Sequence, residues 1–241
     1  MIDIHSHILP CVDDGSESIE ESLQLLQIMK EQGITAVIAT PHFYPHEDSL
    51  DEFLEKTAAA YKELCEAARN KGLPDIYLGS EILYFEGMGH SASLDNLCLN
   101  NSSYLLVELT DECIGESLMA NLKYLKQNSG IIPIIAHVER YFRAKKYRKF
   151  IKFLEKEKIT VQINASSVTN ADYDRVIAKL MKSGLRILIG TDTHSVDVRP
   201  PLMDKALNTI SQKYGIQCYN KIVKNIDIFY NKIVTDGGLY D

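Results

Sequence analysis

The sequence contains no C-x-x-C pair and no C-x5-R stretch. Its cysteines are odd in number and scattered, which is typical of reduced thiols and not of a disulfide framework. We therefore expect a cytoplasmic protein with free cysteines. Because no cysteine starts a phosphate-binding arginine loop, a thiolate-dependent phosphatase is excluded. The five cysteines are Cys11, Cys65, Cys98, Cys113 and Cys218.

Long runs of one chemical character are also missing. There is no extended basic stretch, and 26 basic against 33 acidic residues give a net charge of −7. Binding of nucleic acid or of an anionic membrane by bulk electrostatics is therefore not expected. The sequence has no signal-peptide core and no apolar run of membrane length, so we expect no direct insertion into a membrane.

What the chain does have is a regular alternation of short apolar runs and helical patterns. No linker, low-complexity segment or repeat divides it, so we expect one domain over residues 1–241. About seven βα units predict an α/β fold, either a closed parallel barrel or a related open sheet. The expected strands lie near residues 1–5, 35–40, 76–82, 104–109, 131–136, 159–163 and 185–190. After a first helix that starts at residue 18, further helices are expected near residues 48–71, 115–129, 143–157, 171–183, 201–214 and 222–232.

The clearest helical signal begins at Ser18, whose hydroxyl can cap a helix while Glu21 completes a capping box. Apolar residues then recur at helical spacing, and Gly33 stands where a helix terminator is expected. The expected buried face consists of Ile19, Leu23, Leu26 and Met29.

The strongest functional signal is the pair His5 and His7 at the end of the first expected strand. Side chains at positions i and i+2 of a strand point to the same face, so the two imidazoles aim at one point, as a metal site requires. Asp192 and His194 repeat this spacing after the last expected strand, which indicates a shared role as ligands.

Other polar side chains follow the expected strands at their carboxyl ends, the edge at which parallel α/β folds place their active sites. Taken singly, a carboxylate here is more often a helix cap, and a histidine is more often a structural residue. Six of the seven expected strands contribute one, however, and Glu81 and Glu108 directly follow apolar runs, where an unpaired carboxylate needs a nearby cation. In the first loop, Asp14 and Asp13 are alternative ligands. The set is His5, His7, Asp14, His42, Glu81, Glu108, His137, Asp192 and His194.

In order and spacing, these residues resemble the polymerase and histidinol phosphatase (PHP) family. The resemblance covers roughly residues 1–200 and is closest to the branch of manganese-dependent protein tyrosine phosphatases from bacterial capsule and exopolysaccharide operons. It implies a PHP-type distorted (β/α)7 TIM-like barrel. The segments that carry it are MIDIHSHILPCVDDGSES, ATPHFYP, GSEI, LLVEL, IAHVERY and GTDTHS.

The resemblance further implies a centre of three divalent metal ions. His5, His7, Glu81 and Asp192 would hold the first ion. Glu81 would bridge to the second, which Glu108 and His137 complete, and Asp14, His42 and His194 would hold the third. Imidazole and carboxylate ligands without thiolate suit manganese, iron or zinc, and manganese comes from the resemblance.

The formal charge of such a centre favours an anionic substrate. Three divalent ions and four carboxylates leave +2 in a protein of net charge −7. Arg140 and Arg199 follow the ligands His137 and His194 and resemble the phosphate-binding arginines of the family. Surface solubility is their alternative role.

The function implied by the resemblance is hydrolysis of phosphotyrosine. The substrate would be the phosphorylated tail of a tyrosine autokinase that controls capsular or exopolysaccharide synthesis. We hypothesise direct attack of a metal-activated water on phosphorus, without a covalent enzyme intermediate. A homo-oligomer is compatible with the resemblance.

Three other functions are weighed against this one. A small-molecule phosphatase, for example one acting on histidinol phosphate, would share the metal chemistry and differ at the pocket rim. An exonuclease is disfavoured by the acidic charge. A non-catalytic regulator of the kinase is disfavoured by the complete set of ligands. The aromatic residues available for a protein-binding rim, or equally for packing, are Phe43, Tyr44, Tyr84, Phe85, Tyr141 and Phe142.

Overall fold

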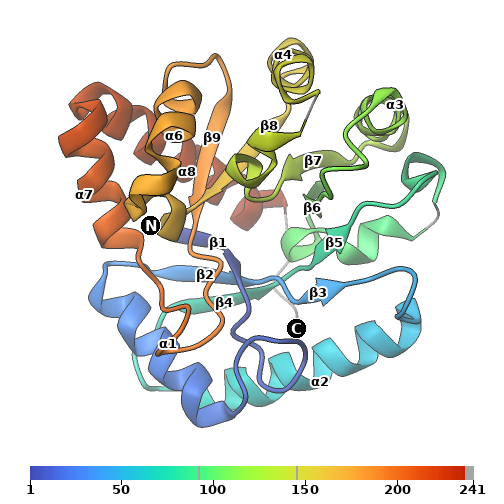
Figure 1. Cartoon of the computed structure of the whole chain (residues 1–241). Helices are drawn as coiled ribbons and strands as arrows, with labels where there is room; N and C mark the ends of the chain where they lie inside the picture. Colours follow the sequence, from blue (N-terminus) through green and yellow to red (C-terminus); the bar gives the residue numbers. More distant parts are fainter. Residues whose placement is uncertain (92, 145, 237–241) are drawn as a thin grey trace.

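The computed structural model describes residues 1–91, 93–144 and 146–236, and its strands occupy the seven expected positions (Figure 1). Two of those positions are each divided into two short strands. The strands are β1 (Ile2–Ser6), β2 (Ala36–Ala39), β3 (His42–Phe43), β4 (Asp75–Leu78), β5 (Glu81–Leu83), β6 (Tyr104–Glu108), β7 (Ile132–Ile135), β8 (Thr160–Asn164) and β9 (Arg186–Gly190).

The helices also follow the expected order, with differences at their ends. The helix expected over 143–157 begins later, because residues 138–143 form a 3-10 turn, and the last helix is longer than the expected 222–232. The short helix after β8 was not expected from the sequence. The helices are α1 (Ile19–Glu31), α2 (Leu50–Ala68), α3 (Glu116–Tyr124), α4 (Tyr147–Glu157), α5 (Ala165–Thr169), α6 (Asp174–Met181), α7 (Met203–Tyr214) and α8 (Ile216–Asp236).

All strand pairs are parallel, and they form one distorted barrel. One sheet has the order β1-β2-β4 and the other β3-β5-β6-β7-β8-β9, with β3 continuing β2 and β5 continuing β4. Pro41 stands at the first break, where its missing N–H interrupts a strand ladder. The ring is completed between β1 and the segment after β9, where the Asp192 amide donates to the His5 carbonyl and the His7 amide to the Thr193 carbonyl, both at 2.8 Å. The expected (β/α)7 barrel is thereby confirmed.

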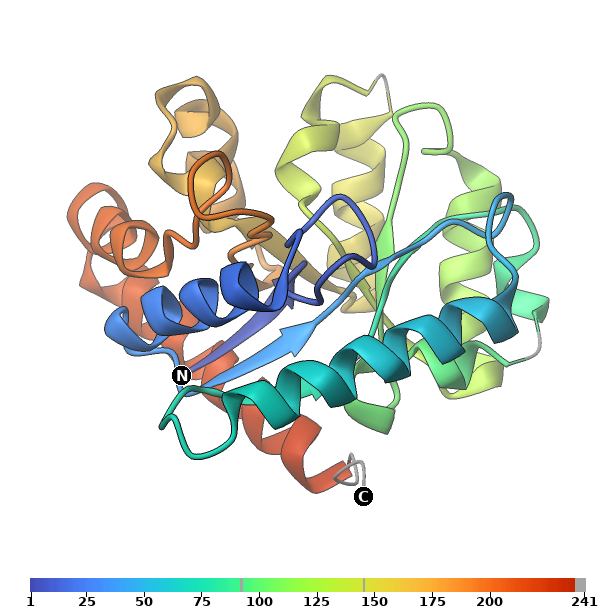
Figure 2. The ribbon, with the colours of Figure 1, turned by 90° about the horizontal axis from the view of Figure 1, so that it is seen from below.

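The helices cover the outside of the strands. Helices α1 and α2 lie next to each other on one side, as the view in Figure 2 shows. Helix α8 packs against α7, β9 and β1. Every residue of β1, β2, β6 except Glu108, and β8 is buried, as expected for strands covered on both faces. Within the described residues, no helix is both long enough and apolar enough to cross a bilayer.

The start of α1 shows one of the two hydrogen bonds of the expected capping box. The Glu21 amide donates to the Ser18 hydroxyl at 3.1 Å, but the Glu21 carboxylate accepts from the Glu17 amide and not from Ser18. Its other oxygen accepts from the Val196 amide at 3.2 Å, which ties α1 to the loop after β9. The predicted buried face is partly wrong, because Ile19 and Leu23 lie at the edge of the stripe. The buried residues are Ser22, Leu25, Leu26 and Met29.

Gly190, the last residue of β9, packs directly against the first strand. A Cβ atom built there lies 2.8 Å from the Cβ of His5 and 3.0 Å from Nε2 of Gln162. We predict that Gly190→Ala lowers the free energy of unfolding by about 1–3 kcal/mol, because both buried side chains must shift. Urea unfolding followed by circular dichroism measures this change.

Gly184→Ala is the matched control, since the nearest atom to its added Cβ is 3.8 Å away. We expect this variant to change the free energy of unfolding by no more than about 0.5 kcal/mol. Equal effects of the two variants would contradict the packing of Gly190 on His5.

Candidate metal centre

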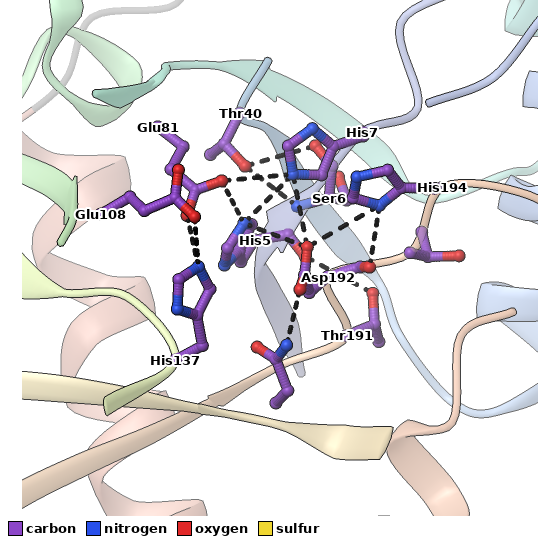
Figure 3. Close-up of polar contacts among 12 residues, drawn as sticks. His5, Ser6, His7, Thr40, Glu81, Glu108, His137, Thr191, Asp192 and His194 are labelled. Carbon is purple, nitrogen blue, oxygen red and sulfur yellow. Dashed lines mark hydrogen bonds and ion pairs between the residues drawn. The ribbon is translucent and has the colours of Figure 1, made fainter. Parts of the chain in front are cut away.

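All nine side chains expected to form a site converge at the carboxyl end of the barrel. Figure 3 shows seven of them pointing toward one another. Asp13, the alternative to Asp14, contacts His7 from outside this cluster. His5 lies in β1 and His7 just after it, Asp14 lies in the following loop, His42 begins β3, Glu81 begins β5, Glu108 ends β6, His137 follows β7, and Asp192 and His194 follow β9.

These residues form three overlapping groups in which the candidate ligand atoms lie within 4.8 Å of one another. Glu81 belongs to two of the groups and His7 to two, so neighbouring ions would share ligands. The groups are His5, His7 and Glu81; His42, Glu81 and Glu108; and His7, Asp14, His42 and His194.

Asp192 and His137 extend the first two groups. Asp192 Oδ1 lies 3.4 Å from Nε2 of both His5 and His7. Nε2 of His137 lies 3.0 Å from Glu81 Oε1 and 3.2 Å from Glu108 Oε1. These groups differ from the implied ones because His7 also lies among Asp14, His42 and His194, and His42 also lies beside Glu81 and Glu108.

Residues outside the cluster determine which ring nitrogen of His5 and of His7 carries the proton. His5 Nδ1 lies 3.2 Å from the Gln162 side-chain oxygen, and His7 Nδ1 lies 2.7 Å from Asp13 Oδ2. Both partners can only accept, so in each neutral ring Nδ1 carries the proton and Nε2 a lone pair. The two Nε2 atoms are 3.2 Å apart and both face the carboxylate of Glu81.

His194 repeats this arrangement on the far side of the cluster. Its Nδ1 donates to the backbone carbonyl of Asp192 at 3.0 Å, which leaves a lone pair on Nε2. That Nε2 is buried, has no hydrogen-bond partner among the described residues, and lies 3.3 Å from Asp14 Oδ1. A lone pair that faces a carboxylate is repulsive unless a cation lies between them.

The pKa shifts of His7 and His137 also show that positive charge is favoured in the cluster. Burial opposes a proton on His7, but hydrogen bonds to Asp13, Asp192 and Glu81 outweigh it and raise its pKa well above the usual range. Burial likewise opposes a proton on His137, while Glu108 and Glu81 raise its pKa to about 9. Imidazole and carboxylate groups of this kind suit a first-row divalent ion, which would replace these protons.

Asp13 and Asp14 lie in different positions relative to the cluster. Asp14 lies in the cluster, with its side chain 67% exposed. Asp13 lies behind His7 and accepts further hydrogen bonds from the amides of His42 and Gly15, both at 3.0 Å. Asp13 thus holds the first loop and orients His7.

Three supporting residues were not found from the sequence. Gln162 fixes His5 and also accepts from the His137 amide at 2.7 Å, while Asn164 donates to Asp192 Oδ2 at 2.5 Å. The Tyr141 hydroxyl lies 2.9 Å from Nδ1 of His137 and accepts from the Leu109 amide. A signal existed for the first two, because Gln162 and Asn164 are polar residues two positions apart in a strand that alternates polar and apolar residues.

Asp192 is the most constrained residue of the cluster. Its Oδ2 accepts from Nη2 of Arg140 and Nη2 of Arg199, each at 2.7 Å, in addition to Asn164. Burial alone would raise the pKa of Asp192, but His5 and His7 hold it well below its usual range. Its φ is +53° and that of His137 is +29°, a backbone strain that concentrates at functional sites.

The aromatic residues expected near the rim divide into two groups. Phe43, Tyr84 and Tyr141 are buried in the core, and the Tyr141 hydroxyl also contacts His137. Phe142 remains 37% exposed, and the ring of Tyr44 stacks on His42 at a centroid distance of 5.1 Å. His90 packs on Tyr124 away from the cluster.

Comparison with known proteins gives independent information on the family and the fold of this chain. Residues 1–228 match the sequence model of the family described as capsular polysaccharide synthesis, CpsB/CapC. The chain is 31% identical over 226 residues to the tyrosine-protein phosphatase CpsB of Streptococcus pneumoniae, covering 89% of this chain and 91% of that protein. It is 32% identical over 231 residues to the putative tyrosine-protein phosphatase CapC of Staphylococcus aureus, covering 93% and 89%.

The fold is similar to that of a solved structure from work on YwqE of Bacillus subtilis and CpsB of Streptococcus pneumoniae, described as unique metal-dependent tyrosine phosphatases. The TM-score is 0.84 at 22% identity, covering 100% of this chain and 96% of the other. A structure of an amidohydrolase is more distant, with a TM-score of 0.55 at 14% identity, covering 95% and 99%. Both likenesses support the distorted barrel.

We predict that Asp13→Asn weakens metal binding by about 10–100-fold, because a neutral amide is a poorer acceptor for the Nδ1 proton of His7 and leaves Nε2 less basic. Competition against a fluorescent chelator, with manganese as the probe ion, measures the affinity. Circular dichroism reports whether the variant is folded.

Asp51→Asn, an exposed position in the first turn of α2, serves as the matched control and should bind manganese like the parent protein. If Asp13→Asn retains full affinity in a folded protein, the role assigned to Asp13 is wrong.

Proposed function

This chain belongs to the CpsB/CapC family of capsular polysaccharide synthesis proteins, and we propose that it is a metal-dependent phosphatase acting on phosphotyrosine in a protein. The observation that carries the proposal is the set of imidazole lone pairs turned toward buried carboxylates at the end of the barrel. A centre that holds several cations in a small space suits the three anionic oxygens of a phosphoryl group.

The proposed ligands are the nine residues inferred from the sequence. His5, His7, Glu81 and Asp192 would hold one divalent ion, Glu81, Glu108 and His137 a second, and Asp14, His42 and His194 a third. We propose manganese, with iron or zinc as alternatives, because the ligands are imidazole and carboxylate groups without thiolate. When bound, such ions neutralise phosphate charge and lower the pKa of water.

The protein's own contribution to the phosphoryl group comes from Arg140 and Arg199. Each uses one Nη2 to bind Asp192, and their side chains are 38% and 37% exposed. The remaining N–H groups are therefore open to a substrate at the mouth of the site. Two planar guanidinium groups held by one buried carboxylate would bind equatorial phosphoryl oxygens, where negative charge develops during hydrolysis.

The proposed physiological substrate is the phosphorylated tail of a tyrosine autokinase that controls capsular or exopolysaccharide synthesis. The family to which the chain belongs supports this assignment, since its description names capsular polysaccharide synthesis. We propose the cytoplasm as its location, in line with five unpaired cysteines. A homo-oligomer stays a prediction, which sedimentation equilibrium would test.

The first test compares phosphate release from a phosphotyrosine peptide and from histidinol phosphate. The protein is chelated and then reloaded with manganese, iron or zinc. We expect turnover of the peptide that disappears on chelation and returns with metal, and little turnover of histidinol phosphate. The reverse preference would assign a small-molecule phosphatase, and turnover of neither compound would refute a phosphatase of either kind.

A second test separates phosphate binding from metal binding. We predict that Arg140→Ala lowers kcat/KM for the peptide by about 100-fold while the metal content is unchanged, because Arg199 and Asn164 still hold Asp192. Metal content is measured by elemental analysis of the purified variant.

Arg186→Ala, an exposed arginine at the opposite end of β9, is the matched control and should retain parental kinetics. Loss of metal from Arg140→Ala would show that Arg140 is structural and would reject its assignment to phosphate.

A further inference from the structure

A groove of about 760 Å3 runs between helices α4 and α6, outside the metal centre. Its floor is apolar and includes Tyr147, Ile151, Val176 and Leu180, with Phe142 at one end. The two helices flank β8 on the outside of the barrel (Figure 1). No step of the proposed reaction uses this groove.

The rim of the groove is strongly basic. Arg148 and Lys152 project from α4, and Arg175 and Lys179 from α6, and all four are exposed. Within the described part of the chain, none of the four takes part in an ion pair. Glu155 is the one acidic residue lining the groove, and its Oε1 accepts from the Gly184 amide at 3.0 Å. Such a concentration of cations is unexpected in a chain of net charge −7.

The lining of the groove starts two residues along the chain from Arg140, which binds Asp192 of the cluster. Phe142 lies two residues after Arg140 on the same 3-10 turn, and Ala144 continues the lining toward α4. Both helices follow strands of the barrel and begin at its carboxyl end, so Arg148 and Arg175 lie nearer the site than Lys152 and Lys179. A chain leaving the site past Arg140 would therefore enter the groove.

The other side of the centre has the opposite charge. A smaller pocket of about 360 Å3 is lined by Arg199 and the proposed ligands Asp14 and His194, and its other charged residues, Glu17, Glu21 and Asp197, are all acidic. An acidic segment would be repelled there and attracted on the Arg140 side. The molecule thus offers a substrate two flanks of different charge on either side of the phosphate position.

We propose that the groove between α4 and α6 binds an acidic segment of the phosphotyrosine substrate, with apolar residues against its floor. This assignment rests on the proposed function. Because Lys152 lies five residues, about 7.5 Å, along α4 from Tyr147, and an extended chain advances about 3.3 Å per residue, this part of the groove spans about two to three residues of an extended substrate.

The test uses four substrates: phosphotyrosine itself, a neutral peptide, and two peptides with a run of three glutamates either before or after the phosphotyrosine. The protein is the metal-loaded full chain, compared with the double variant Lys152→Glu/Lys179→Glu. We expect one acidic peptide to have a KM at least about fivefold below that of the neutral peptide. The double variant should abolish this advantage and leave kcat and the turnover of phosphotyrosine unchanged.

Lys62→Glu/Lys224→Glu makes the same change of charge on two helices that do not line the groove, and it should keep the preference. An advantage that survives Lys152→Glu/Lys179→Glu, or equal KM values for all three peptides, would overturn the proposal while phosphotyrosine turnover upholds the proposed function. No turnover of phosphotyrosine by the parent protein would instead refute that function. A change of sedimentation coefficient in the groove variant alone would assign the groove to contact between copies of the chain and also overturn the proposal.

Discussion

At the carboxyl end of this barrel, imidazole lone pairs and carboxylates face one another, and their repulsion is removed only by positive charge between them. Nε2 lone pairs of His5 and His7 face the buried carboxylate of Glu81, and that of His194 faces the exposed carboxylate of Asp14. The Nδ1–H groups of these three rings donate hydrogen bonds to Gln162, Asp13 and a backbone carbonyl, which leaves the lone pairs on Nε2. In the absence of metal, protons on the histidines supply only part of this positive charge, as the raised pKa values of His7 and His137 indicate. The strands must therefore supply enough packing energy to hold like groups together until ions bind.

Asp192 connects this cluster to the surface that would meet a phosphate. One carboxylate oxygen faces His5 and His7, and the other accepts from Arg140, Arg199 and Asn164. Three donors on one oxygen fix the orientation of the carboxylate, which helps to explain how a non-glycine residue is held at a φ of +53°. Metal binding and phosphate binding would consequently be coupled through a single side chain, since a shift of Asp192 would displace both arginines.

The sequence allowed the strands and the cluster to be predicted because each rests on a local pattern. Apolar runs mark buried parallel strands, and a polar residue directly after such a run must lie at the carboxyl edge. The closure of the barrel could not be read in this way, since it depends on backbone hydrogen bonds between residues 5–7 and residues 192–193, more than 180 residues apart. The roles of Gln162 and Tyr141 also depend on distances between elements. The sixth expected strand contributes no histidine or carboxylate, yet Gln162 and Asn164 on β8 position His5 and Asp192.

The exposure of the site increases from its floor to its mouth. His5 and Glu81 are at most 1% exposed, the arginine side chains 38% and 37%, and that of Asp14 67%. Buried ligands keep water from competing for the ions and strengthen their field, whereas partly exposed arginines leave the phosphate position accessible. A small metabolite gains affinity from being enclosed, but a phosphorylated side chain must enter while its own backbone stays outside. An enclosed floor with an open, arginine-bordered mouth therefore fits a protein substrate better than a free metabolite.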